Sequence, residues 1–186
     1  MPLSRLLLIG GIISGVFVVA IIAMSNPLAP FQDEYKQTAA NQLAFGLIQN
    51  STRIGLLAHE MTNEQREAKG LPPLEWDQAI SRIAAMHSQD MVERNYFDHA
   101  DPEGNHHSDR YLQQGYDCNN ASGENIYMHE GILLGYSDEK IAEEAVIGWM
   151  NSEGHRENIL YDGFQKEGIG VHIRPSLSVY LTQNFC

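Results

Sequence analysis

The feature that most restricts how this chain folds is an uninterrupted, uncharged and mostly apolar run from Leu6 to Met24. At ~1.5 Å per residue in a helix, a run of this length crosses a bilayer core of ~30 Å. Arg5 precedes the run, while Asp33 and Glu34 follow it, so the positive-inside bias places the amino terminus in the cytoplasm and the domain outside. We therefore predict a single-pass membrane anchor at residues 1–25.

The alternative for this segment is a cleaved signal peptide, which would release the domain as a secreted protein. Signal peptides usually carry an apolar region of ~7–15 residues, which is shorter than this run. The small residues near its end, Ala20, Ala23 and Ser25, do not form an Ala-x-Ala cleavage site. The sequence favours the uncleaved anchor, and either alternative exports the domain.

The charge of the chain argues against one class of partner. All 24 acidic residues and all but one of the 12 basic residues follow the apolar run, and the formal net charge is -12. Nucleic acids and anionic lipid surfaces are themselves negative and repel such a domain. We expect no nucleic-acid partner, contact with the membrane only through the N-terminal helix, and a slight preference for cations.

Behind the anchor, the chain is predicted to form a stalk and one domain. The stalk is the mixed, polar segment 26–50, and the domain occupies 51–186, with Ser51 as the N-cap of a first helix over 52–69. Leu71–Trp76 is expected to be an extended turn, because each proline restricts the residue before it. Further helices are predicted to begin at Asp77, Ser108 and Ser137.

Two segments near the C-terminus alternate apolar and polar residues, as antiparallel strands do. They are 168–173 and 177–183, and Glu124–Met128 is predicted to be a further short strand. Helices and strands are interleaved without the spacing of βαβ units. This pattern indicates the α+β class with a small antiparallel sheet.

The sequence lacks the common catalytic motifs. His59 and Glu60 begin like the zinc-binding helix of metalloproteases, but the second histidine would have to stand at position 63, which is Asn63. There is no Gly-x-Ser-x-Gly elbow and no glycine-rich phosphate loop. A site must therefore come from residues that the fold brings together.

Four such candidates lie at the ends of predicted elements. His99 follows the second helix, Glu124 begins a strand, and Glu153 and His155 flank Gly154 after the last helix. Polar residues that share one rim supply the converging groups of a binding site. Two imidazoles with one or two carboxylates also suit a divalent metal such as zinc. Taken singly, each residue is more simply interpreted as a surface histidine or a capping carboxylate.

The order of several spaced motifs resembles the CAP superfamily (cysteine-rich secretory proteins, antigen 5 and pathogenesis-related 1), in particular its bacterial and archaeal SCP-like branch. The motifs that carry the resemblance are Gly70-Leu-Pro-Pro-Leu-Glu-Trp76, Tyr96-Phe-Asp-His99, Gly123-Glu-Asn-Ile126, Trp149 to Leu160 and Gly168-Ile-Gly-Val171. They run through the whole domain after the stalk, in the order that the family has.

The resemblance implies a three-layer α-β-α sandwich and a surface cleft with two histidines and two acidic residues, which binds a divalent metal in some members. His99 matches the first histidine, Glu124 the Gly-Glu-Asn glutamate and His155 the Gly-His histidine. Many eukaryotic members have the fourth residue three places after the tryptophan, where this chain has Ser152. Glu153 lies one place later, and a shift of one residue on a helix turns a side chain by ~100°.

The chain has two cysteines, Cys118 and Cys186. In an exported domain a disulfide is the default state of such a pair, and two unrelated buried thiols are the alternative. The resemblance places Cys118 just before the Glu124 strand and Cys186 at the end of the last strand. It therefore implies a disulfide between Cys118 and Cys186.

Three functions follow from the resemblance and the candidate residues. The first is an extracytoplasmic binding module whose cleft takes a lipid, a glycan or a peptide, with a divalent metal such as zinc as a structural or affinity element. The second is a metal-dependent hydrolase or peptidase, in which His99 and His155 hold the metal and Glu124 acts as the base. The third is a structural or adhesive surface protein. The sequence leaves open whether the protein is an enzyme.

Overall fold

The structure is a computed structural model that describes residues 12–13, 16–17, 29–118, 121–131, 136–174 and 178–186. The predicted anchor lies mostly outside these ranges; within it are two antiparallel strands, β1 (Ile12–Ile13) and β2 (Val16–Phe17). In the described part of the chain, no helix is both long and apolar enough to cross a membrane. The chain divides into two compact units, Met1–Leu43 and Ala44–Cys186, and the candidate site lies in the second.

The first helix, α1 (Ala29–Glu67), begins well before the predicted start. The prediction of an N-cap at Ser51 is wrong, because Ser51 lies inside this helix. Serine costs less than ~1 kcal/mol at an interior helix position, so the residue type alone does not mark a boundary. The helix ends as predicted before Gly70, which has a φ of 74°. Arg66 then fixes the next turn, because its Nε donates to the backbone oxygen of Pro72 at 3.0 Å.

A four-stranded sheet forms the middle of the domain, in the order β3-β5-β6-β4. Its strands are β3 (Glu75–Trp76), β4 (Gly123–His129), β5 (Lys166–Arg174) and β6 (Ser178–Phe185). The predicted hairpin is confirmed as the antiparallel pair β5–β6, and the predicted Glu124 strand is confirmed as β4. The sheet is mixed, because β3 pairs in parallel with β5. Strand β3 lies within Leu71–Trp76, which was predicted to be an extended turn.

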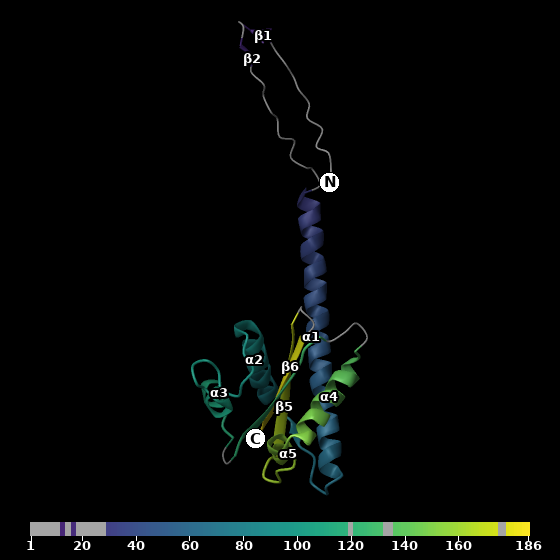
Figure 1. Ribbon diagram of the computed structural model, residues 1–186, viewed down its shortest axis with the longest axis vertical. Coiled ribbons are helices and arrows are strands. Elements are labelled where there is room, and N and C mark those ends of the chain that lie inside the picture. Colours follow the sequence, from purple (N-terminus) through teal and green to yellow (C-terminus); the bar gives the residue numbers. More distant parts are fainter. Residues whose placement is uncertain (1–11, 14–15, 18–28, 119–120, 132–135, 175–177) are drawn as a thin grey trace. The chain divides into compact units, whose positions relative to one another are not determined.

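Helices cover both faces of this sheet, which confirms the α+β class. On one face, inward residues of β6 such as Leu181 pack in one core cluster with Ile54 of α1 and Trp149 of α4 (Asp138–Asn151). Trp149 is buried, and its Nε1 donates to the backbone oxygen of Ile126 at 3.0 Å. On the other face, the alternate residue Tyr180 packs with Met91 of α2 (Gln78–Arg94). Figure 1 shows α2 and α4 on opposite sides of β5 and β6.

Two glycines let α2 lie directly on the sheet. A Cβ atom added at Gly168 would stand 2.1 Å from the backbone nitrogen of Ser81, and one added at Gly170 would stand 1.9 Å from that of Ala85. No side chain fits there, so the Gly168-x-Gly170 pair is explained by the close approach of helix and strand. The side chain of Ser88 completes the contact by donating to the backbone oxygen of Gly170 at 3.1 Å.

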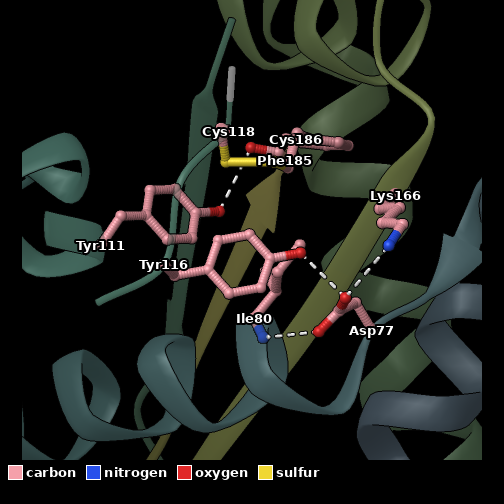
Figure 2. Close-up of a disulfide and its surroundings, with 8 residues drawn as sticks. All are labelled: Asp77, Ile80, Tyr111, Tyr116, Cys118, Lys166, Phe185 and Cys186. Atoms are coloured by element: carbon pink, nitrogen blue, oxygen red, sulfur yellow. Dashed lines mark hydrogen bonds and ion pairs between the residues drawn. A yellow bond between two sulfur atoms is a disulfide. The ribbon is translucent and has the colours of Figure 1, made fainter. Parts of the chain in front are cut away.

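The predicted disulfide is confirmed. Cys118 and Cys186 are bonded, with their Cα atoms 5.2 Å apart and a sequence separation of 68. Figure 2 shows the bond beside Tyr111 and Tyr116, with Asp77 close by. As predicted, Asp77 caps α2: its Oδ1 accepts from the backbone nitrogens of the first turn, and its Oδ2 accepts from the Tyr116 hydroxyl at 2.8 Å. The bond therefore joins Cys186, directly after β6, to Cys118, and Tyr116 links this segment to the cap of α2.

Candidate functional site

Three of the four predicted site residues lie together, and each comes from a different element. His99 lies in the loop that follows α2. The C-cap of this helix, Asn95, has the left-handed backbone conformation. Glu124 is the second residue of β4. His155 was predicted to follow a helix end, but it lies in the first turn of a further helix, α5 (Glu153–Ile159), which begins directly after α4. We call His99, Glu124 and His155 the His–Glu site.

Glu124 is the buried centre of this site. Its side chain is 1% exposed, and its Oε2 accepts from Nη2 of Arg110 at 2.6 Å. Its Oε1 lies 2.9 Å from Nδ1 of His99 and 3.9 Å from Nε2 of His87. Burial pushes the pKa of Glu124 upward, but the hydrogen bond from His99 and the charge of Arg110 outweigh it, so the pKa lies below its ordinary value. Glu124 is therefore ionised at neutral pH.

His99 has one ring nitrogen, Nε2, that is not bonded to Glu124. An ionised carboxylate only accepts hydrogen bonds, so Nδ1 of His99 carries the proton that it donates to Glu124, and Nε2 is the other ring nitrogen in the site. The side chain of His99 is 42% exposed, which gives a ligand access to it. The hydrogen bond to Glu124 raises the pKa of His99 above its ordinary value. Glu124 thus fixes both the tautomer and the orientation of this imidazole.

His155 lies beside His99, with their ring centroids 6.1 Å apart. Burial lowers the pKa of His155, and the nearby charge of His99 lowers it further. Its backbone is held to β4, because Nδ2 of Asn125 donates to the His155 oxygen at 3.1 Å. Nδ2 of Asn158 in the same helix donates to the Glu124 oxygen at 3.2 Å. The Gly123-Glu-Asn-Ile126 strand and α5 are therefore locked together at the site.

Glu153 is not joined to this group. It is an exposed residue at the first position of α5. Among the described residues, no hydrogen bond, ion pair or ring contact links it to His99, Glu124 or His155. The shift of one residue from the family position accounts for this separation.

The donor atoms of the site fit a metal only in part. No group of three or more histidine, cysteine, aspartate or glutamate side chains suited to a metal occurs among the described residues. Catalytic zinc sites have three protein ligands. Here Glu124 is committed to Arg110 and His99, which leaves two imidazoles. The residues therefore do not fit a permanently bound catalytic zinc ion.

Two further residues, Arg110 and His87, form the surroundings of Glu124. Arg110 holds the loop by donating to the backbone oxygens of His99 and Asn105, and it also pairs with Glu124. His87 is a buried histidine, and its Nε2 lies 3.0 Å from the backbone oxygen of Asp98. Their proximity to Glu124 follows from tertiary structure, which no local spacing in the sequence signals.

A second buried carboxylate lies on the opposite face of the sheet. Glu167 is fully buried; its Oε1 lies 2.6 Å from Nδ1 of His59, and its Oε2 accepts from Nε2 of Gln183 at 2.7 Å. The same Gln183 nitrogen donates to Thr62 at 3.0 Å. His59 was considered only as part of a metalloprotease helix, and Glu167 was not predicted at all. We call His59, Glu167 and Gln183 the α1-side network.

Comparison with known proteins places this fold in a family. The family model described as "Cysteine-rich secretory protein family" (CAP) matches residues 59–185. Two proteins of Bacillus subtilis are similar: YkwD, 41% identical over 111 residues, and a membrane protein, YlbC, 39% identical over 126 residues. These alignments cover 60% and 68% of this chain but only 39% and 32% of the relatives. The chain thus spans less than half the length of either relative.

Solved structures agree with this assignment. An extracellular protein of Bacillus anthracis containing an SCP domain is 27% identical, with a TM-score of 0.64; the match covers 91% of this chain and 46% of that protein. The structure of NaASP2 with Zn2+ matches 73% of this chain and 78% of its own, at 17% identity and a TM-score of 0.52. At that identity the second likeness shows the fold alone.

Proposed function

The chain belongs to the cysteine-rich secretory protein (CAP) family, and from that premise we propose that it is a membrane-anchored, extracytoplasmic binding module whose ligand site is the His–Glu site. The observation that carries the proposal is the buried, ionised Glu124, which orients the half-exposed His99 beside His155. A fixed pair of imidazoles supported by a buried carboxylate is a preorganised site for a ligand.

The proposed location rests on several observations. The Leu6–Met24 run has the composition of a membrane anchor. The Cys118–Cys186 disulfide is typical of an oxidising compartment outside the cytoplasm. One relative is named as a membrane protein, and one structural relative as an extracellular protein.

The chemistry of the site favours a polar ligand. His99, whose side chain is 42% exposed, would have to give up hydration beside a lipid tail, which costs free energy without a compensating hydrogen bond. A glycan or a peptide supplies hydroxyl or amide groups that bond to the imidazoles. We therefore propose a glycan or peptide group as the ligand in preference to a lipid.

We further propose that the two imidazoles bind a divalent cation such as zinc exchangeably. His99 and His155 would be the ligands, and Glu124 would support His99 through its other ring nitrogen, as carboxylates commonly do for metal-bound histidines. NaASP2, which shares the fold, was crystallised with Zn2+.

The hydrolase alternative is weaker, because Glu124 is poorly placed as a base. Its carboxylate is buried, it is bound by Arg110 at 2.6 Å, and its pKa is lowered. A general base works best with a pKa near the working pH. The third alternative is a purely structural role for the site. Measurements of ligand binding and melting temperature on the same variants distinguish it from the binding module.

Zinc titration of the full chain in detergent, with a competing fluorescent chelator, tests the site. We expect His155→Ala and His99→Ala to abolish zinc binding, and Glu124→Gln to weaken it roughly 10–100-fold. His106→Ala is the matched control, because His106 is an exposed histidine that caps α3 (His107–Gln113) outside the site. An equal loss in the control would contradict a site made of His99 and His155.

A digestion assay separates the remaining alternatives. A peptide library is incubated with the protein, with and without chelator. If the peptides are cleaved, and if both chelator and His155→Ala abolish the cleavage, the protein is a hydrolase and the proposal of a binding module is wrong. A lower melting temperature in His99→Ala and His155→Ala, with zinc and glycan binding unchanged, would support the structural role instead.

A further inference from the structure

A pocket of about 190 Å³ lies between α2 and α3, separate from the half-exposed imidazoles. Ile83, Met86 and Asp90 line it from α2, and Arg110 and Gln113 line it from α3, with Gln114 beyond. Its volume exceeds that of several water molecules but lies below the ~300–1,000 Å³ of pockets for drug-sized ligands. The pocket therefore suits a group the size of one amino-acid residue.

Arg110 forms a fixed part of the wall of this pocket. Its side chain is 10% exposed, and both terminal nitrogens are occupied by backbone oxygens and by Glu124. Its Nε is buried and has no hydrogen-bond partner in the described part of the chain. Because this nitrogen has no accessible surface, Arg110 is a fixed part of the wall, and the donors for a ligand must come from its neighbours.

Asp90 brings an unused acceptor. Its Oδ2 accepts from the Tyr96 hydroxyl at 2.6 Å, whereas its Oδ1 lies 3.6 Å from Nη1 of Arg94, beyond hydrogen-bond distance. Arg94 is itself engaged, because both of its terminal nitrogens donate to Glu103. Oδ1 of Asp90 is therefore in an ion pair with Arg94 but has no hydrogen bond from it, and it can accept one from a ligand.

The charges around the pocket favour a cation. Each guanidinium group of the wall has a carboxylate partner, Glu103 for Arg94 and Glu124 for Arg110. Asp90 and Asp101 add two further carboxylates, and burial lowers the pKa of His87, which keeps this imidazole neutral. An anionic ligand would meet an excess of negative charge, and a cationic group would be attracted.

The remaining wall is amphipathic. Met86 is 50% exposed, so its thioether lies open to a ligand, and Ile83 extends the apolar surface inward. The side-chain amides of Gln113 and Gln114 make no hydrogen bond with any described residue of the chain. An aliphatic side chain and a peptide group would both find partners here.

We propose that this α2–α3 pocket binds a primary ammonium group next to a carbonyl oxygen, as in the amino-terminal residue of a peptide with an aliphatic side chain. The ammonium group pairs with Asp90, the carbonyl oxygen accepts from the side-chain amide of Gln113, and the side chain packs on Met86. This site goes beyond the His–Glu site and requires neither exposed imidazole.

The test uses methyl NMR of the full chain in detergent micelles, with the Met86 signal assigned by Met86→Leu. L-leucinamide is the probe, because it has the ammonium group, the carbonyl oxygen and an aliphatic side chain. We expect a saturable shift of the Met86 signal. N-acetyl-L-leucinamide, which lacks the charge, should bind roughly tenfold more weakly.

Asp90→Asn separates the charge from the fold, because asparagine still accepts from the Tyr96 hydroxyl. In this variant L-leucinamide should bind about as weakly as the acetylated probe, and the difference between the two probes should disappear. Asp162→Asn, at an exposed aspartate outside the pocket, is the matched control and should bind as the wild type does.

Three results would overturn the proposal. They are an equal affinity for 4-methylpentanoate, which carries a negative charge and no ammonium group, an equal affinity for glucose, and the absence of a saturable shift up to about 10 mM L-leucinamide. His99→Ala should leave probe binding unchanged, so a failure here and a failure of the His–Glu site are distinguishable.

Discussion

The two faces of the sheet each bury a glutamate beside a histidine, but the two pairs differ in their third partner. Glu124 faces α2 and α3, where Arg110 donates to it at 2.6 Å and His99 at 2.9 Å. Glu167 faces α1, where His59 and Gln183 are its hydrogen-bond partners. The opposite orientation follows from the register, because Glu124 pairs with Asn184 while Glu167 pairs with the next residue, Phe185.

This difference decides the protonation of the two carboxylates. Burial raises the pKa of Glu167 above its ordinary value, and the hydrogen bonds from His59 and Gln183 offset only part of the rise. At Glu124 the same burial is outweighed, and the pKa is lowered. A contacting guanidinium keeps its charge at any physiological pH, whereas an imidazole can lose its proton and an amide carries no charge. Burial alone therefore does not indicate which of the two glutamates is ionised and can support a ligand site.

Removing the guanidinium should produce the largest effect. Arg110→Leu leaves Glu124 as a buried charge without its cation, and we expect a loss of ~3–5 kcal/mol in the free energy of unfolding. Chemical denaturation of the full chain in detergent measures it. The matched control is Arg82→Leu, at an exposed arginine on α2. If Arg110→Leu combined with Glu124→Gln is as unstable as Arg110→Leu alone, the unpaired charge is not the cause.

Neutralising each glutamate should separate the two faces. In Glu124→Gln the new amide group meets two donors, Arg110 and His99, so we expect a loss of ~1–3 kcal/mol. In Glu167→Gln the amide donates to His59 and its oxygen accepts from Gln183, so stability at neutral pH should be unchanged or rise by up to ~1 kcal/mol. Equal losses in both variants, measured by the same denaturation, would contradict the comparison.

The pH dependence of these variants should have opposite signs. The lowered pKa of Glu124 gives stability that is present above its ordinary value of 4.5 and is lost as the pH falls through the folded-state pKa. The raised pKa of Glu167 gives stability that is present below 4.5 and is lost as the pH rises through the folded-state pKa. Relative to wild type, Glu167→Gln should therefore gain stability as the pH rises above 4.5.

The measurement is the difference in the free energy of unfolding between wild type and each variant across pH. Each unit by which a pKa is shifted corresponds to ~1.4 kcal/mol. A Glu167→Gln difference that stays flat between pH 4.5 and neutrality would show that Glu167 ionises as readily in the folded state as in the unfolded one.

Motif order predicted His99, Glu124 and His155, because family blocks fix their places along the chain. The same reasoning missed the Glu124–Arg110 pair, since the partners lie 14 residues apart on different elements. Strand β3 was missed because two residues are too short to show alternation. Its parallel partner β5 lies far along the chain, so only the folded structure reveals the pairing.

The two glycines of β5 indicate a close contact that the sequence prediction did not include. Gly168 and Gly170 stood out in the sequence as two glycines in one strand, and a glycine inside a strand is typical of close backbone approach. The structure shows α2 in that place. Glu153 shows the opposite case: its place in the sequence predicted a ligand, and its one-residue displacement left it exposed at the start of α5.

Substitution of His59 or His99 should give the smallest changes in the free energy of unfolding. His59 has a side chain that is 15% exposed and lies 2.6 Å from Glu167, so His59→Asn should cost ~0.5–1.5 kcal/mol. His99 is 42% exposed, and water replaces its bond to Glu124, so His99→Asn should cost less than ~1 kcal/mol. The zinc titration should rank them in reverse, with binding lost only in His99→Asn. A parallel ranking in stability and zinc binding would mean that the His–Glu site, like the α1-side network, serves mainly to hold the fold.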